Sequence, residues 1–139
     1  KEELFRYPVF GAILRRLGAF PVKRGQSDRE AIKKSLEVLR KGNILGVFPE
    51  GHRIASGKLG QFQEGAVHLA IKCNAAILPV GVKGTRGMFR KFRFHPFSVR
   101  IGQPISVENS DNLPAAEFAR QLNERVRQEV GKLSGLELD

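Results

Sequence analysis

The sequence predicts an α/β fold in which a mixed, mostly parallel sheet is layered with helices. Two observations lead to this prediction. Apolar runs of strand length alternate along the chain with amphipathic segments of helix length. The run 44–48 is continuously apolar apart from one glycine, as expected for a strand that is covered on both faces. With 139 residues the chain has the length of one domain, so we expect a single domain over 1–139.

The chain begins with an amphipathic pattern. Apolar residues at spacings of three and four predict a short helix from Pro8 to Leu17, and Gly18 stands where a left-handed helix end is common. The next residues, 19–22, form a brief apolar run that we interpret as a strand.

A second helix and a second strand follow. Ser27 and Asp28 are candidate N-caps for a helix over about 29–40, and the spacing from Ser27 to Glu30 fits a capping box. The apolar run 44–48 is predicted to be the next buried strand.

The second half of the chain repeats this alternation. A glycine-containing loop leads to a helix over about 64–73, and 77–82 has the apolar composition of a buried strand. The alternating segment 97–101 is typical of an exposed or edge strand. Pro114 begins a final amphipathic helix.

The charge of the chain indicates anionic partners. Lys and Arg number 24 against 14 Asp and Glu, a net charge of +10. Between positions 65 and 107 there is no acidic residue, while seven Lys and Arg lie in that span. Such a surface attracts phosphates, acidic lipids, acidic carrier proteins or nucleic acid, and charge alone does not choose among them.

Cysteine and histidine usage excludes two classes of site. Cys73 is the only cysteine, so no intramolecular disulfide forms and we expect a reducing, cytosolic setting. One cysteine and three scattered histidines show no metal-ligand spacing, so we expect no metal. No apolar run approaches the roughly 20 residues that cross a bilayer, so any membrane contact is expected to be peripheral.

The most informative segment is Phe48-Pro49-Glu50-Gly51-His52-Arg53. It places a carboxylate, a glycine and a guanidinium just after the predicted strand 44–48. Arg24 likewise comes just after the predicted strand 19–22. Ligands of α/β sheets bind beyond the carboxyl ends of strands. A guanidinium grips phosphate oxygens through two parallel hydrogen bonds, so Arg24 and Arg53 are candidate phosphate ligands.

Three segments in this order resemble the glycerophospholipid acyltransferase family, whose members acylate glycerol 3-phosphate and its 1-acyl derivative. They are 18–24, 48–53 with its continuation Phe62-Gln63-Glu64-Gly65-Ala66, and 77–82. The resemblance implies a glycerol-3-phosphate-acyltransferase-like fold and covers most of the chain.

The resemblance also implies residue roles. Arg24 and Arg53 would bind the acceptor's phosphate, while Glu50 and Gly51 would shape the loop that positions the acceptor. His52 belongs to the same loop and replaces the Thr that the family usually has, which bears on acceptor preference. Pro79 would match the proline of the last segment, with a structural role.

One element of the family is missing from the sequence. The family removes the acceptor's hydroxyl proton with a His that is oriented by an Asp five positions later. Here the positions five after His52, His68 and His95 are occupied by Gly57, Cys73 and Arg100. The family's dyad precedes the Arg24-like element. We therefore expect that the chain is truncated at its N-terminus, carries no catalytic residue itself, and is inactive alone.

The function implied is a 1-acyl-sn-glycerol-3-phosphate O-acyltransferase that makes phosphatidate from lysophosphatidate. Acyl-CoA or acyl-carrier protein would be the co-substrate, with no cofactor, no metal and no nucleic acid. The enzyme would be cytoplasmic and peripheral to the inner face of the cell membrane. Two alternatives remain open: an acyltransferase for glycerol 3-phosphate or another lysophospholipid, and a non-catalytic module that binds anionic lipid or nucleic acid.

The segment 86–97 interleaves four Phe with four Arg and Lys. One interpretation is a basic, aromatic surface that rests on anionic lipid headgroups. Another is stacking on single-stranded nucleic acid. A third is a loop and edge strand whose Phe side chains enter the core while the cations face water.

Overall fold

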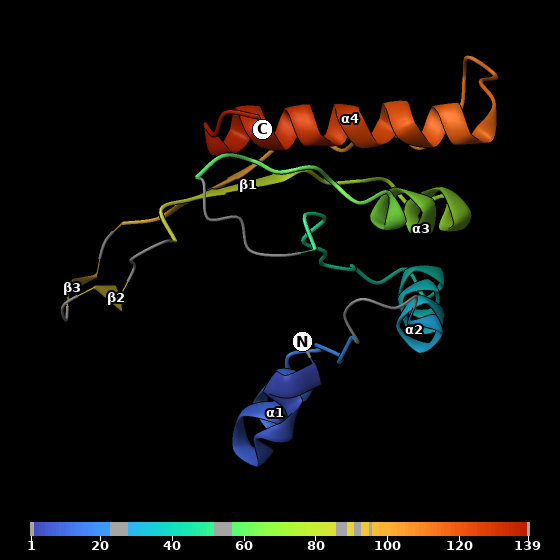
Figure 1. Cartoon of the computed structure of the whole chain (residues 1–139). Helices are drawn as coiled ribbons and strands as arrows, with labels where there is room; N and C mark the ends of the chain where they lie inside the picture. The colour runs from blue at the N-terminus through green and yellow to red at the C-terminus, as the bar shows by residue number, and fades with distance from the viewer. Residues whose placement is uncertain are drawn as a thin grey trace. The chain divides into compact units, whose positions relative to one another are not determined.

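The computed structural model describes residues 2–22, 28–51, 57–85, 89–90, 93–94 and 96–138. The chain divides into two compact units, Lys1–Leu45 and Gly46–Asp139 (Figure 1). Each unit is described by itself, and the expectation of a single domain over 1–139 stays a prediction.

The first unit opens with two short helices, the 3-10 helix η1 (Glu2–Arg6) and α1 (Pro8–Arg16). Pro8 stands in the first turn of α1, where a missing N–H costs nothing. Gly18 ends this segment with a φ of +81°, as its position after the apolar pattern predicts. The first predicted helix is confirmed.

Helix α2 (Arg29–Arg40) begins at one of the two predicted caps. The Asp28 side chain accepts a hydrogen bond from the Ala31 N–H at 3.1 Å. This bond satisfies one of the amide groups that a helix start leaves without an intrahelical partner. The alternative cap Ser27, and with it the capping box, lies outside the described residues.

Two predicted strands are wrong. Residues 19–22 and 44–48 form no ladder with any described residue. Ile44 is 95% exposed and Phe48 is 84% exposed. An apolar run becomes a strand only when a neighbour pairs with its backbone N–H and C=O groups, and no described segment does so here.

The described residues of the second unit form a helix, four short strands and a long helix. Its elements are α3 (Gly65–Cys73), β1 (Val80–Lys83), β2 (Phe89–Arg90), β3 (Arg93–Phe94), β4 (Ser98–Ile101) and α4 (Ala115–Ser134). The predicted helices 64–73 and from Pro114, and the strands 77–82 and 97–101, are therefore confirmed with shifts of a few residues.

Both strand pairs among the described residues are antiparallel. β1 pairs with β4 in a register that places Val80 opposite Ile101, and β2 pairs with β3. The sequence predicted a mostly parallel sheet, and this pairing differs because the described residues between β1 and β4 form the short antiparallel β2–β3 pair rather than a helix. A parallel pair requires a long crossover connection, usually a helix, whereas a chain that turns straight back pairs antiparallel.

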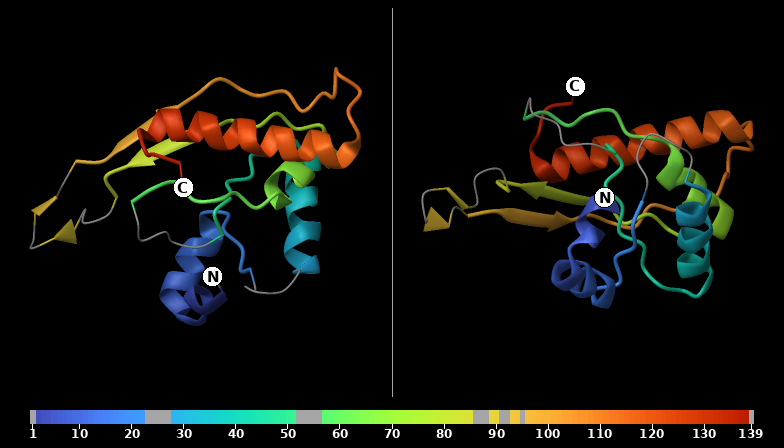
Figure 2. Two further views of the ribbon diagram at one scale, coloured as in Figure 1. Left: turned by 45° about the horizontal axis from the view of Figure 1, so that its top comes forward. Right: turned by 60° about the horizontal axis from the view of Figure 1, so that its bottom comes forward.

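The core of the second unit lies between α3, α4 and the segments beside them. Figure 2 shows α4 running along β1 and β4 in both views. The buried apolar side chains are Leu59, Phe62, Val67, Ala70, Ile105, Val107, Ala119, Leu122 and Val126. Cys73 is half-buried at the end of α3, which agrees with a packing role.

At Gly81 the backbones of β1 and α4 approach each other closely. A Cβ added there would lie 2.4 Å from the Ser134 backbone nitrogen and 2.5 Å from the Leu133 carbonyl carbon. On the neighbouring strand, the Arg100 guanidinium donates to the Leu133 carbonyl at 3.4 Å. The helix therefore rests on the strand backbone itself at this position, which only glycine permits.

Arg127 is a buried cation on α4 whose loss we expect to destabilise the protein. Its Nε donates to the Gly60 carbonyl at 3.0 Å, and its guanidinium also contacts Glu124 at 3.5 Å. Arg127→Met keeps the length of the side chain but leaves a buried carbonyl without that donor. We expect the free energy of unfolding to fall by about 2 kcal/mol, measured by urea titration.

The matched control is Arg120 on the same helix. Its guanidinium pairs with Glu117 at 2.8 Å in an exposed position, and hydrogen bonds from Arg120 and then Gln121 hold the pKa of Glu117 below its usual value. Exposed pairs of this kind add little, so Arg120→Met is expected to leave the urea midpoint almost unchanged. If Arg127→Met and Arg120→Met lowered the free energy of unfolding equally, the hydrogen bond from Arg127 to the Gly60 carbonyl would have no structural role.

No helix in the described part of the chain combines the length and the apolar character needed to span a bilayer.

Candidate functional site

The structure describes two of the five predicted site residues. Glu50 and Gly51 lie at the start of the second unit, after Phe48 and Pro49. Arg24, His52 and Arg53 lie outside the described residues. Convergence of the two arginines on one phosphate therefore stays a prediction.

Residues 48–51, the described part of the loop predicted to position the acceptor, form a tight turn. The Gly51 N–H donates to the Phe48 carbonyl at 3.2 Å, and Gly51 has a φ of +69°. Most residues avoid this left-handed region, whereas glycine adopts it freely. The glycine of the motif is thus explained by backbone geometry.

This turn is joined to the continuation of the motif. The Gln63 N–H donates to the Pro49 carbonyl at 2.9 Å. A Cβ on Gly51 would lie 2.6 Å from Gln63 Nε2, so the glutamine side chain covers the turn. Residues 48–51 and 62–66, which the sequence suggested as two parts of one motif, are therefore in direct contact.

The continuation is in turn held by α4 and the C-terminal segment. The Leu59 N–H donates to the Glu137 carbonyl at 2.8 Å, and Asn123 Nδ2 donates to the Phe62 carbonyl at 3.0 Å. The Phe62 ring is buried in the core. Together with the Arg127 bond to Gly60, these contacts fix residues 59–63 on a long helix, which is the rigid support that a binding loop needs.

Sequence reasoning missed Asn123, Arg127 and Gln63 as supporting residues. Asn123 and Arg127 lie 61 and 67 positions from their partners, so no local spacing predicts their bonds.

Glu50 is half-buried, and among the described residues it makes no hydrogen bond or ion pair. A carboxylate in this setting is available to accept a hydrogen bond from a hydroxyl or from a guanidinium. An acceptor hydroxyl and an arginine guanidinium are the two partners that the sequence predicted for Glu50.

The described histidine does not form a catalytic pair. His68 Nε2 lies 3.4 Å from a Glu64 carboxylate oxygen one turn earlier on α3, and both side chains are largely exposed. His52 and His95 lie outside the described residues. In the described ranges, no three His, Cys, Asp or Glu side chains are grouped so that they could hold a metal ion.

Pro79, for which the sequence predicted a structural role, lies at one end of the β1–β4 pair. It is buried just before β1, and its carbonyl accepts a hydrogen bond from the Gly102 N–H at 3.0 Å. This bond joins the ends of the β1–β4 ladder.

Comparison with known proteins identifies the family. The family model described as Acyltransferase matches residues 1–83. The chain is also 35% identical over 144 residues to a 1-acyl-sn-glycerol-3-phosphate acyltransferase of Pseudomonas aeruginosa, an alignment that covers 99% of this chain and 56% of that protein. The chain belongs to the acyltransferase family. The resemblance read from residues 18–24, 48–53 and 77–82 is thereby confirmed.

Two further relatives agree. A protein of Bacillus subtilis with the same name is 29% identical over 140 residues, covering 98% of this chain and 69% of that protein. The crystal structure of the 1-acyl-sn-glycerophosphate (LPA) acyltransferase PlsC from Thermotoga maritima matches with a TM-score of 0.68 and 27% identity. That match covers 95% of this chain and 54% of the crystallised one. The α/β fold class is thus confirmed, and the chain spans about half to two thirds of the length of these three relatives.

The Gly51 turn yields a prediction about the loop. In Gly51→Ala, a left-handed backbone costs about 1–2 kcal/mol and the new methyl group also strikes the Gln63 amide. We expect a lower free energy of unfolding and weaker binding of lysophosphatidate, measured by urea titration and by titration with the lipid.

Gly57→Ala is the matched control, because Gly57 has a φ of +81° but no atom within 4 Å of the added carbon. It should show the backbone cost alone. We expect Gly51→Ala to lose more stability than Gly57→Ala. Adding Gln63→Ala to Gly51→Ala should remove this extra loss in the free energy of unfolding. If the excess persists in that double variant, the contact with Gln63 is not its cause.

Proposed function

We propose that this acyltransferase chain forms the acceptor-binding part of a 1-acyl-sn-glycerol-3-phosphate O-acyltransferase. The observation that carries the proposal is the alignment of 99% of the chain with an enzyme of that name. The turn at Glu50 and Gly51, which is held by Gln63, supports it because it gives the motif a defined geometry.

The proposed reaction transfers an acyl group from a thioester to an alcohol. The free hydroxyl oxygen of lysophosphatidate attacks the thioester carbonyl, the new ester C–O bond forms, and the C–S bond breaks to release the thiol of the acyl carrier. The hydroxyl proton passes to a general base, which hands it on to the departing sulfur so that the carrier leaves as a thiol. We assign that base to the family's His, four residues, Asp element, which none of the three histidines of this sequence matches.

The roles of the loop residues follow from their chemistry. Arg24 and Arg53 hold the phosphate through paired N–H donors, and the charge of the chain favours an anionic acceptor. Glu50 accepts a hydrogen bond from an acceptor hydroxyl or orients one of the arginines. His52 adds a donor beside the phosphate and thereby influences which phosphorylated acceptor is preferred.

The setting that fits this reaction is the inner face of the cell membrane. Lysophosphatidate and phosphatidate are lipids with anionic headgroups, and a chain with a net charge of +10 is attracted to such a surface. The acyl donor is acyl-CoA or acyl-carrier protein, both of which are anionic as well. No cofactor takes part in the proposed chemistry.

The test is an acyl-transfer assay on the complete gene product that carries this chain. Lysophosphatidate, glycerol 3-phosphate and lysophosphatidylcholine are offered as acceptors, each with acyl-CoA and with acyl-carrier protein. Phosphatidate as the main product supports the proposal. A preference for glycerol 3-phosphate or another lysophospholipid would move the assignment to that acceptor. No transfer, together with tight oligonucleotide binding, would favour a non-catalytic module.

A further inference from the structure

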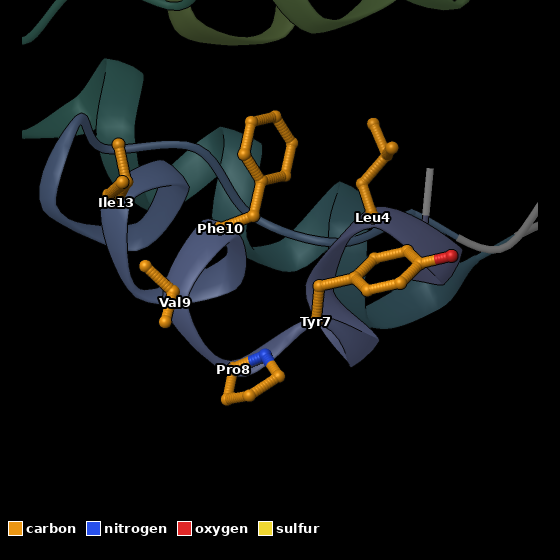
Figure 3. Close-up of a pocket in the computed structure, with 6 residues that line it drawn as sticks. All are labelled: Leu4, Tyr7, Pro8, Val9, Phe10 and Ile13. Carbon is orange, nitrogen blue, oxygen red and sulfur yellow. The ribbon is translucent and has the colours of Figure 1, made fainter.

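A group of apolar side chains is exposed on the two N-terminal helices. Val9, Ile13 and Leu17 follow one another at intervals of four, so they share one face of α1. Val9 is 74% exposed and Leu17 is 76% exposed. Figure 3 shows Leu4 and Phe10 projecting in the same direction from η1 and α1. We define the α1 apolar face as Leu4, Tyr7, Val9, Phe10, Ile13 and Leu17.

The opposite side of α1 is packed, which fixes the orientation of the exposed face. Gly11 is buried, and a Cβ on it would lie 2.7 Å from the Phe5 carbonyl oxygen. The Arg15 guanidinium lies 5.7 Å from the centre of the Phe5 ring. Because η1 covers this side, the α1 apolar face points away from the packed side and borders an open hollow of about 560 Å³.

Arginines accompany the apolar face. Arg6, Arg15 and Arg16 are exposed, and α1 has no acidic residue. Arg16 stands three positions after Ile13, so it borders the face directly. The acidic residues that lie nearest to α1 in the sequence are Glu2 and Glu3. Both belong to the first turn of η1, before Leu4. An apolar stripe edged by arginines matches the chemistry of an anionic bilayer surface.

We propose that the α1 apolar face enters the surface of an anionic bilayer, with Arg6 and Arg16 at the level of the lipid phosphates. Tyr7 suits this arrangement because its ring is apolar and its hydroxyl is polar, as is common at membrane interfaces. The inference rests on the membrane contact in the proposed function and names the surface that makes it. The inference makes no use of the segment 86–97, of which the structure describes only 89–90, 93–94 and 96–97.

The absence of tryptophan from the chain allows a direct test with single-tryptophan probes. Val9→Trp places the probe on the α1 apolar face. Ile44→Trp is the matched control, since Ile44 belongs to the same unit and is 95% exposed on a different segment. Both variants of the 139-residue chain are mixed with vesicles of phosphatidylglycerol and phosphatidylcholine, and with vesicles whose acyl chains are brominated.

We expect the Val9→Trp emission to shift to shorter wavelength with anionic vesicles and to be quenched by brominated lipid, while Ile44→Trp stays unchanged. The shift should weaken with added salt and with neutral vesicles, because part of the attraction is electrostatic. Emission from Val9→Trp that does not respond to vesicles would overturn the inference. A blue shift without lipid that grows with protein concentration would do so too, because a second copy would then cover the face.

Sedimentation with vesicles provides a second measurement in the complete gene product. We expect Val9→Ser combined with Ile13→Ser to raise the lipid concentration for half-maximal binding by about tenfold, and Ile44→Ser to leave it unchanged. Unaltered binding in the double variant, with a lowered melting temperature, would show instead that another part of the protein packs on this face.

The two proposals fail in different ways. If the face is the membrane contact, the double variant still acylates lysophosphatidate dispersed in detergent, because no residue of the acceptor loop has changed. If the proposed function is wrong, transfer is absent from the unmodified protein, whatever its binding to vesicles. A protein that acylates dispersed lysophosphatidate but never sediments with anionic vesicles would overturn only the inference on the face.

Discussion

Replacing Arg53 by Ala is expected to reduce acyl transfer to lysophosphatidate by roughly 30- to 100-fold at low acceptor concentration, given two charge-assisted hydrogen bonds to phosphate. The loss should appear mainly in KM, because the phosphate is held equally before and during attack on the thioester. The measurement is the steady-state rate of the complete gene product as a function of lysophosphatidate concentration.

Two controls make this result specific. Arg53→Lys keeps the charge but loses the planar pair of donors, so we expect it to recover only part of the activity. Arg40→Ala removes an exposed arginine at the end of α2 and should change neither KM nor kcat. Unchanged kinetics in Arg53→Ala would reject the assignment of this residue to the acceptor phosphate.

Gly81→Ala is expected to produce the largest loss of stability. The added methyl carbon would lie 2.4 Å from the Ser134 backbone nitrogen. The methyl group is attached to the backbone of β1, and the nitrogen belongs to the backbone of α4. A flexible side chain cannot move aside to relieve such a contact, so α4 must shift away from β1. We expect the free energy of unfolding to fall by at least about 3 kcal/mol, since overpacking against side chains alone already costs about 1–3 kcal/mol.

The matched control for this glycine is Gly65→Ala. Gly65 begins α3, its φ is not in the left-handed range, and no atom lies within 4 Å of an added Cβ. The same change of composition should therefore leave stability unchanged or raise it by up to about 1 kcal/mol. Urea titrations of both variants compare them directly. A Gly81→Ala protein as stable as Gly65→Ala would show that α4 does not rest on β1 as described.

The helices could be predicted from the sequence because their signals are local. The spacing of apolar residues, the cap at Asp28 and the glycine at position 18 all lie within the segment that they define, and the structure confirms α1, α2, α3 and α4. The apolar runs 19–22 and 44–48 had the composition of strands as well. They form no ladder with any residue that the structure describes, because pairing depends on a neighbour that composition does not reveal.

The acceptor loop shows the same division. The need for glycine at position 51 and the link between 48–51 and 62–66 were suggested by the motif, and the hydrogen bond between Gln63 and Pro49 now explains that link. The support from Asn123 on α4 had no local signal in the sequence. The meeting of Arg24 and Arg53 at one phosphate remains a prediction, which the Arg53→Ala kinetics address.

For this protein the amino-acid sequence alone determined the family, the helical segments and the link between the motif at 48–53 and its continuation at 62–66, because each is recorded in short stretches of chain. Only the tertiary structure decided that β1 and β4 pair antiparallel, that Gly81 must be glycine, and that Arg127 anchors residue 60. These features depend on contacts between segments some twenty to seventy residues apart, whose geometry emerges only when the chain has packed.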